Sequence, residues 1–489
     1  MKSIKGFLNS SIVIIFTFFI FLTFVGSIRS TNLIIAGTSA RIFIIPILLF
    51  VAWILYKYTS FWSLLSRYSL VLGVGSFFLV VVIQLYMIFQ THPPIGFDLW
   101  HFYNAIDLRN FKAESSYFSL YPNNLLLFLI QKKFITSIGL SHYWLKLDLL
   151  NIVLVDLSAL IGIFTIYIYN KTELTKAIWL YTIWLLFFPM IVVPYSDTFV
   201  LPLVSAILFF IVAVIKYKDV KIRFVSLLFL GILTILTYFM KPSAIIPVIA
   251  IAIMSLLNFK KVNIKNILIF LVFLISLSGS YVIINHQITG QNYIKINKTQ
   301  HIPIVHFIDI GMSGIKGGYN QQSFNYISSL KNAKQRKNYS IKDIKRTLTN
   351  RGPLGYLKFL ITKQGYNTAD GTFGWLQEGN FIKASSKKEP NVFKDYLYPD
   401  GKHLPDFKFI AQLVWIFYLV ILLFSFRQKG VLENTLRLGI IGGFIFLLFF
   451  EGGRSRYMIQ FLPMILIMII ITFNTSISKI KNMIGTFKN

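Results

Sequence analysis

The sequence contains no cysteine, and its 489 residues include only 18 aspartates and glutamates. The absence of cysteine excludes disulfides and metal sites built from thiolates. Charged residues of both signs make up 13% of the chain, whereas hydrophobic residues make up 55%. A soluble protein of this length would divide its apolar residues among short amphipathic patterns. This chain instead contains long, continuous apolar runs, which are typical of a membrane protein.

About twelve of these apolar runs are close to the length that crosses a membrane, roughly 20 residues for a helix. They cover residues 11–27, 42–56, 69–90, 143–169, 176–193, 197–215, 223–240, 243–259, 265–285, 409–426, 436–450 and 457–474. An outer-membrane barrel would show alternating segments of about ten residues instead. The sequence therefore predicts an all-α polytopic membrane protein with about 12 transmembrane helices.

Lysine and arginine outnumber the acidic residues by 48 to 18, which gives a formal net charge of +30. In a soluble chain this excess would suggest a nucleic-acid partner. Here much of it falls in short connections between apolar runs, which is the pattern of the positive-inside rule. We therefore expect a multi-pass protein of the plasma membrane with cytoplasmic N- and C-termini and no nucleic-acid partner. The first helix is expected to be retained, since no convincing cleavage site follows it.

Two long segments face outward in this predicted orientation. Residues 91–142 include an amphipathic stretch with charges in its middle, which predicts helices lying along the membrane interface. Residues 286–408 are too long for a simple connection and predict a small mixed α/β extracytoplasmic domain. The predicted organisation is a transmembrane catalytic module at 1–285, this domain at 286–408, and C-terminal transmembrane helices at 409–489.

Two aspartates in the first outer loop are candidate catalytic residues. Asp98 follows Pro93 and Pro94 in a rigid turn that would place it at a helix start, where the helix dipole favours the ionised form. An ionised carboxylate suits a general base that accepts a proton from a hydroxyl group. Asp107 lies two and a half helical turns later, so the two would point to opposite sides of one helix. A simple helix cap is the alternative role for Asp98.

Three basic residues at predicted outer helix ends are candidate ligands for a phosphate group. Lys241 lies between two apolar runs, and a cation near the hydrocarbon boundary is costly unless it is paired. Snorkelling to the interface is the alternative. Arg454 and Arg456 lie in a glycine-rich turn and can fork onto phosphate oxygens, with Glu451 positioned to orient one of them. The alternative for this turn is a solvated loop with an internal ion pair.

A further set of polar and aromatic residues is predicted to bind the sugar or its acceptor. The carboxylate and hydroxyls at Tyr195–Thr198 suit sugar hydroxyls, although ordinary helix capping explains them equally well. The loop around Trp375 combines an aromatic platform with polar groups. The full set is Tyr121, Asn123, Asn124, Tyr195, Ser196, Asp197, Asp370, Trp375, Glu378 and Glu451. The histidines show no HExxH or similar spacing, so we predict no metal site and no cofactor.

Several short motifs resemble those of the GT-C membrane glycosyltransferases. The motifs are FDLWHFYNAI, YFSLYPNN, PYSDT, MKPSAIIP, DGTFGW and EGGRSRYMIQFLP, and they are spread over most of the chain. The arrangement is similar to the protein O-mannosyltransferases and to the bacterial enzymes that move aminoarabinose onto lipid A, and it looks most like a Gram-positive branch of that superfamily. The resemblance implies a polyprenyl-phosphate sugar donor, used on the outer leaflet with inversion at the anomeric carbon.

Carried over by position, the resemblance implies that Asp98 is the general base and that Lys241, Arg454 and Arg456 surround the donor phosphate. The DxD-like acids of the oligosaccharyltransferase branch are missing, which implies metal independence. The predicted function is therefore transfer of a sugar from polyprenyl phosphate onto a cell-envelope acceptor, such as teichoic acid, polysaccharide or another wall polymer. Two alternatives stay open: a transporter or flippase of lipid-linked sugars, and a polymerase or ligase of wall glycans.

Overall fold

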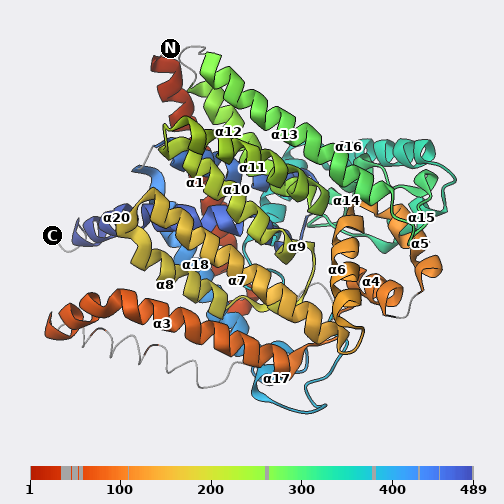
Figure 1. Cartoon of the computed structure of the whole chain (residues 1–489), viewed down its shortest axis with the longest axis horizontal. Helices are drawn as coiled ribbons and strands as arrows, with labels where there is room; N and C mark the ends of the chain where they lie inside the picture. The colour runs from red at the N-terminus through yellow and green to blue at the C-terminus, as the bar shows by residue number, and fades with distance from the viewer. Residues whose placement is uncertain are drawn as a thin grey trace.

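The computed structural model describes residues 2–34, 46, 53, 59–107, 110–258, 264–376, 381–427, 430–450 and 452–486. Within these ranges, nine helices are long and apolar enough to cross a membrane. Many of them run side by side in one bundle (Figure 1). The same ranges contain no β-strand, and their only bridge pairs Ile95 with Ile382. The chain is thus an all-helical polytopic membrane protein, as the apolar runs predict.

The spanning segments come from the long helices of the chain. They are α1 (Lys2–Ile28), α3 (Thr59–Thr91), α7 (Tyr143–Tyr169), α9 (Ser196–Phe199) continued by α10 (Leu201–Lys216), α11 (Val220–Met240), α13 (Ile264–Thr289), α18 (Leu404–Leu423), α19 (Val431–Phe449), and the 3-10 helix η9 (Ser455–Phe461) continued by α20 (Leu462–Thr486).

The other helices are mostly shorter than the spans. They are α4 (Asp98–Ile106), α5 (Phe111–Leu120), α6 (Leu125–Ile138), α8 (Leu174–Leu186), α12 (Ile246–Leu257), α14 (Ile304–Gly311), α15 (Gln321–Ser329), α16 (Ala333–Thr368) and α17 (Val392–Leu397). The exception is α16, which has 36 residues and a kink at Gly352, where φ is +61°. The remaining 3-10 turns are η1 (Thr31–Leu33), η3 (Pro122–Asn124), η4 (Lys171–Glu173), η5 (Pro189–Val192), η6 (Pro242–Ile245), η7 (Lys298–Gln300) and η8 (Ser425–Arg427).

The count of nine spans corrects the prediction of about twelve. The predicted span 42–56 lies outside the described residues, apart from positions 46 and 53. The apolar run 176–193 breaks into the short helix α8 and the turn η5, because Pro189 cannot continue a helix. The run 243–259 forms a helical segment, Pro242–Leu257, that is shorter than a span. In the described part of the chain, apolar length alone therefore overcounts the spans, because Pro189 divides one run and another forms too short a helix.

The prediction of a mixed α/β domain at 286–408 is also wrong, since the described part of this segment folds as the helices α14–α17. Asparagine side chains cap the first turns of α15, α16 and α17, at Asn320, Asn332 and Asn391. Such caps satisfy amide groups that a helix start leaves without partners, and they favour helix over strand. Helix α16 packs against α1, α14 and α19, so this segment lies on the helix bundle itself.

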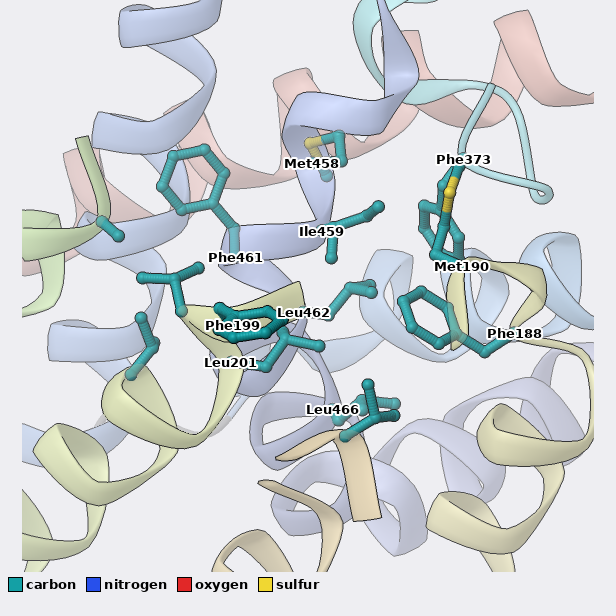
Figure 2. Packing of buried hydrophobic residues seen from close by; sticks show 14 of the residues in the cluster. Phe188, Met190, Phe199, Leu201, Phe373, Met458, Ile459, Phe461, Leu462 and Leu466 are labelled. Carbon is teal, nitrogen blue, oxygen red and sulfur yellow. The ribbon is translucent and has the colours of Figure 1, made fainter. Parts of the chain in front are cut away.

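The last spanning segment forms the core of the bundle. In its most apolar window 83% of the residues are buried, against 11% for α13. Figure 2 shows Phe461 and Leu462 of this segment beside Phe199 and Leu201, in keeping with the contacts of η9 with α9 and α10. By contrast, α13 exposes apolar side chains such as Ile275, which suits a helix that faces lipid. The last span thus supplies a buried helix around which other spans pack.

Candidate functional site

A cavity of about 700 Å³ lies where α9, α11 and η9 meet α4, α5 and α14. Its wall contains four cationic side chains and one aspartate among the described residues: Lys241, Lys383, Arg454, Arg456 and Asp98. We refer to the space bounded by these five residues as the charged cavity. A concave site with an excess of cations concentrates positive potential and favours an anionic ligand.

Asp98 is the first residue of α4, as the proline-rich turn before it predicts. The residue before it, Phe97, has a φ of 45°, a region that non-glycine residues rarely adopt. One carboxylate oxygen, Oδ2, accepts a hydrogen bond of 2.5 Å from the Tyr195 hydroxyl. Burial, and secondarily the charge of Asp98, raises the Tyr195 pKa well above its ordinary value, so this hydroxyl stays a donor. The local fold thus presents to the charged cavity a carboxylate that accepts a hydrogen bond from Tyr195 and also interacts with the Tyr117 hydroxyl.

Asp197 joins two of the cations beneath the cavity wall. It is 3% exposed, and it forms ion pairs with Lys241 Nζ and, over 3.2 Å, with Arg456 Nε. The Arg456 guanidinium also lies over the rings of Phe97 and Tyr195, at 4.9 and 5.5 Å from the ring centroids. Lys241 therefore already has a partner within the chain. The position of Lys241 near the hydrocarbon boundary therefore does not by itself require a phosphate ligand, because Asp197 already pairs with its charge.

The turn before η9 brings Arg454 to the cavity wall. Gly452 and Gly453 have φ values of +89° and +67°, a conformation that strongly favours glycine. The Asn367 side chain accepts a hydrogen bond of 2.5 Å from the Gly453 amide and fixes the turn from α16. Glu451, which the sequence suggests as a partner for one of the arginines, lies outside the described residues. In its place, Asp197 contacts Arg456.

The described residues of the predicted sugar-binding set divide into two groups. Tyr121, Asn123, Asn124, Tyr195 and Ser196 all line the charged cavity. Within this group, Asn124 Nδ2 donates to the Tyr117 hydroxyl over 2.7 Å, which orients the amide at the wall. This group therefore lies where a ligand in the cavity would touch it.

The second group lies away from the cavity wall. Asp370 accepts hydrogen bonds of 2.7–2.8 Å from the Asn32 side chain, from the amide and hydroxyl of Thr372, and from the Gly374 amide. Trp375 is fully buried, and its indole nitrogen donates a hydrogen bond to the Leu397 carbonyl. Its ring is therefore not an exposed platform for a sugar. Glu378 lies outside the described residues.

Asp107 is separated from the cavity by the length of α4. It is the C-cap residue of that helix and lies beside the Tyr103 hydroxyl. Partial burial, together with this neighbouring carboxyl, raises the Tyr103 pKa. Asp98 and Asp107 thus lie at opposite ends of α4, in agreement with the prediction that they do not form a pair.

Sequence reasoning missed two parts of the cavity wall. Lys383 reaches it through the bridge of Ile95 with Ile382, in which the Gly96 amide donates to the Phe381 carbonyl over 2.7 Å. No local pattern signals this contact between distant segments. His101 lies one helical turn after Asp98 and also lines the cavity, a relation that the i, i+3 spacing would have indicated. In the described part of the chain, no three His, Asp or Glu side chains cluster as metal ligands would.

A family model described as "Conserved hypothetical integral membrane protein" matches residues 4–477, nearly the whole chain. The chain belongs to this family. The family description agrees with the nine apolar spanning helices, and together they identify an integral membrane protein in a lipid bilayer. Neither the curated proteins nor the solved structures contain a significant match to the chain.

This conserved integral membrane protein has a second cavity, of about 890 Å³, next to the charged one. We refer to it as the apolar cavity, because side chains such as Leu125, Phe239 and Ile288 line much of it, from α6, α11 and α13. Polar side chains also line it, among them Asn285 of α13 and Lys295 and Lys298 after that helix. Asn123 and Pro242 line both cavities, so the two spaces adjoin. An amphiphile could therefore contact both cavities, with its head group among the cations.

Proposed function

We propose that this protein is a glycosyltransferase of the GT-C type, which moves a sugar from a polyprenyl-phosphate donor onto a hydroxyl group of a cell-envelope acceptor. The observation that carries the proposal is the convergence of Asp98 and the cations Lys241, Arg454 and Arg456 on one cavity. These residues come from three separate parts of the sequence. The proposal further places the charged cavity on the outer side of the plasma membrane, with both termini in the cytoplasm.

The cations of the charged cavity suit the donor phosphate. Arginine guanidinium groups bind phosphate oxygens in forked pairs, and lysine adds a compact charge. Asp197 neutralises part of the Lys241 and Arg456 charge, and it holds both side chains in place before the ligand arrives. Preorganised cations stabilise negative charge that develops on a leaving group without needing to reorganise. This suits a phosphate that departs as the sugar is transferred.

Asp98 is the proposed general base. Its carboxylate removes the proton of the acceptor hydroxyl as the acceptor oxygen attacks the anomeric carbon from the face opposite the phosphate. The bond between that carbon and the phosphate oxygen breaks, and its electron pair leaves with the phosphate. No general acid is required, because the leaving phosphate is stable as an anion among the cations. A single displacement of this kind inverts the anomeric carbon.

The apolar cavity is the proposed place of the donor's first lipid units. Its lining of leucine, isoleucine and aromatic side chains lies beside the charged cavity, and polyprenyl chains are apolar. Burial of such a chain is favourable by about 25 cal/mol per Å² of apolar surface. The donor phosphate would then lie where the two cavities adjoin, near Pro242.

The proposal is tested with the purified full-length protein in lipid nanodiscs. Polyprenyl-phosphate sugars that carry a radiolabel in the sugar are supplied together with cell-envelope fractions as acceptors. We expect release of polyprenyl phosphate and a labelled polymer. No transfer and no donor binding with any sugar tested would contradict the proposal. A flippase would instead move the labelled lipid across a vesicle membrane with the sugar still attached, and the same labelled donor detects this outcome.

A further inference from the structure

His101 and Glu114 form a pair at the edge of the charged cavity. The His101 Nδ1 atom lies 2.6 Å from Glu114 Oε2, and Asn104 Nδ2 donates to the other carboxylate oxygen over 3.1 Å. Glu114 is 7% exposed, so its carboxylate is largely removed from water. The His101 ring also stacks on Tyr117, with ring centroids 4.1 Å apart. The imidazole is therefore held on one edge and on one face.

This geometry fixes which ring nitrogen is available. An ionised carboxylate only accepts hydrogen bonds, so Nδ1 carries the hydrogen and Nε2 keeps its lone pair. The His101 side chain is 42% exposed, whereas the Glu114 side chain is 9% exposed. His101 also lines the charged cavity together with Asp98, one turn earlier on the same helix. An imidazole held by a buried carboxylate can thus accept a proton from the cavity and release it to solvent.

We propose that His101 is the proton acceptor that restores Asp98 after each transfer, with Glu114 as its positioning residue. This proposal rests on the proposed glycosyl transfer. The proton leaves the acceptor hydroxyl for Asp98 as the new glycosidic bond forms. It then passes through cavity water to Nε2 of His101, and the imidazolium releases it to solvent. Glu114 stabilises the imidazolium, as a buried carboxylate does when it orients a catalytic histidine. Asp98 returns to its ionised form for the next acceptor.

The surroundings of His101 contain charges of both signs. On its own helix the neighbouring acid is Asp98, and from α5 the contacts are Glu114 and Tyr117. The other titratable or charged groups of the cavity wall are Tyr121, Tyr195, Lys241, His306, Tyr319, Lys383, Arg454, Arg456 and Tyr457. Glu114 is the group in direct contact with the ring nitrogen, and the proton-accepting role is assigned to the pair for that reason.

The test compares first and later turnovers. His101→Ala should keep the rapid first turnover, because Asp98 itself accepts the first proton in the proposed mechanism, and should lower the steady-state rate about 100-fold, the lower range of general acid–base effects. Added imidazole should restore part of the steady-state rate, since the deleted ring leaves space in an open cavity. His403→Ala is the matched control: His403 contacts Asp406 over 3.0 Å and stacks on Tyr396, but it lies outside both cavities.

The outcomes separate the two proposals. Suppose that the wild type transfers sugar. If His101→Ala then has the same steady-state rate, or loses both the first turnover and the steady-state rate without rescue by imidazole, the proton role of His101 is overturned. The transferase proposal stands in either case. If the wild type transfers no sugar, both fall together. His101→Gln, which retains a donor for Glu114, replaces the alanine variant if that variant does not fold, and a steady-state loss with an intact first turnover again supports the proposal.

Discussion

Asp98 and Asp370 are both candidate ligand-binding aspartates by sequence, and their surroundings are opposite. Asp370 is 7% exposed and accepts four hydrogen bonds, from two side chains and two backbone amides. Asp98 lines an open cavity, and the Tyr195 hydroxyl is its short hydrogen-bond donor. Both oxygens of the first carboxylate accept hydrogen bonds from its own chain, three on Oδ1 and one on Oδ2. The second keeps capacity to accept a hydrogen bond or a proton from a ligand.

Asp197 lies between these two cases. It is as buried as Asp370, yet its partners are two cations that themselves face the charged cavity. It therefore acts on a ligand only through Lys241 and Arg456. The hydrogen-bond partners that a carboxylate already has therefore indicate whether it supports the fold or binds a ligand. A carboxylate that is fully occupied supports the fold, and one with open capacity can take part in chemistry.

The largest effect is expected for Asp98→Asn. The amide keeps the shape of the side chain but cannot serve as a base, so the rate of sugar transfer should fall by about 10²- to 10⁴-fold. Donor binding and the melting temperature should remain close to those of the wild type. Transfer rates with labelled donor and thermal unfolding in detergent measure the two quantities. A variant that transfers at the wild-type rate would remove Asp98 from the mechanism.

Lys241→Gln should mainly weaken donor binding. A hydrogen bond to a charged group contributes about 1.5–3 kcal/mol, so we expect the donor Kd to rise about 10- to 100-fold. Lys146→Gln is the control, because Lys146 donates to the carbonyls of Ile138 and Gly139 and does not line the cavity. Binding of labelled polyprenyl-phosphate sugar to nanodiscs gives both values. An equal Kd for the two variants would contradict a phosphate site at Lys241.

Asp370→Asn should show the reverse pattern. The asparagine NH₂ group would face the Thr372 or Gly374 amide, which leaves a buried donor unsatisfied at a cost of about 1–3 kcal/mol. We expect a lower melting temperature but an unchanged transfer rate per folded molecule. Thermal unfolding and an activity assay normalised to the folded fraction test this. A stable but inactive variant would show that the Asp370 turn belongs to the site after all.

The smallest effect is expected for Tyr195→Phe, which removes one hydrogen bond from Asp98. Transfer should fall by about tenfold or less, since a charged hydrogen bond contributes about 1.5–3 kcal/mol and only part of it differs in the transition state. In the wild type, burial raises the Tyr195 pKa above 10.0, so the hydroxyl remains protonated as the pH rises to that value. Loss of the Tyr195 proton should therefore not lower the rate below about pH 10. A rate loss near pH 9 that disappears in the phenylalanine variant would contradict this assignment.

The sequence predicts the helical membrane fold and much of the charged cavity, because those features depend on local patterns. Apolar runs mark spans, and the prolines before Asp98 mark a helix start. Predicted outer ends carry Tyr195, Lys241 and Arg456, and these side chains lie around one cavity. Each inference uses neighbouring residues only, which is why it is accessible without a structure.

Long-range partners explain what the sequence could not predict. Asp370 is satisfied in part by Asn32, 338 residues earlier in the chain. Lys383 reaches the charged cavity because the bridge of Ile95 with Ile382 joins two distant loops. The pairing of Asp197 with Lys241 similarly depends on how α9 packs beside the end of α11. Such contacts are set by tertiary packing, so residue type and spacing do not reveal them.

The bridge between Ile95 and Ile382 has a consequence for biosynthesis. The wall of the charged cavity needs Asp98 from the first quarter of the chain, Lys383 from the segment that this bridge holds, and the arginines of the last turn. A ribosome-bound intermediate that ends before residue 454 lacks both arginines of that wall. The wall of the charged cavity is thus incomplete until residue 456 has been synthesised, and under the proposed function a lipid-linked donor would meet a finished site only after that point.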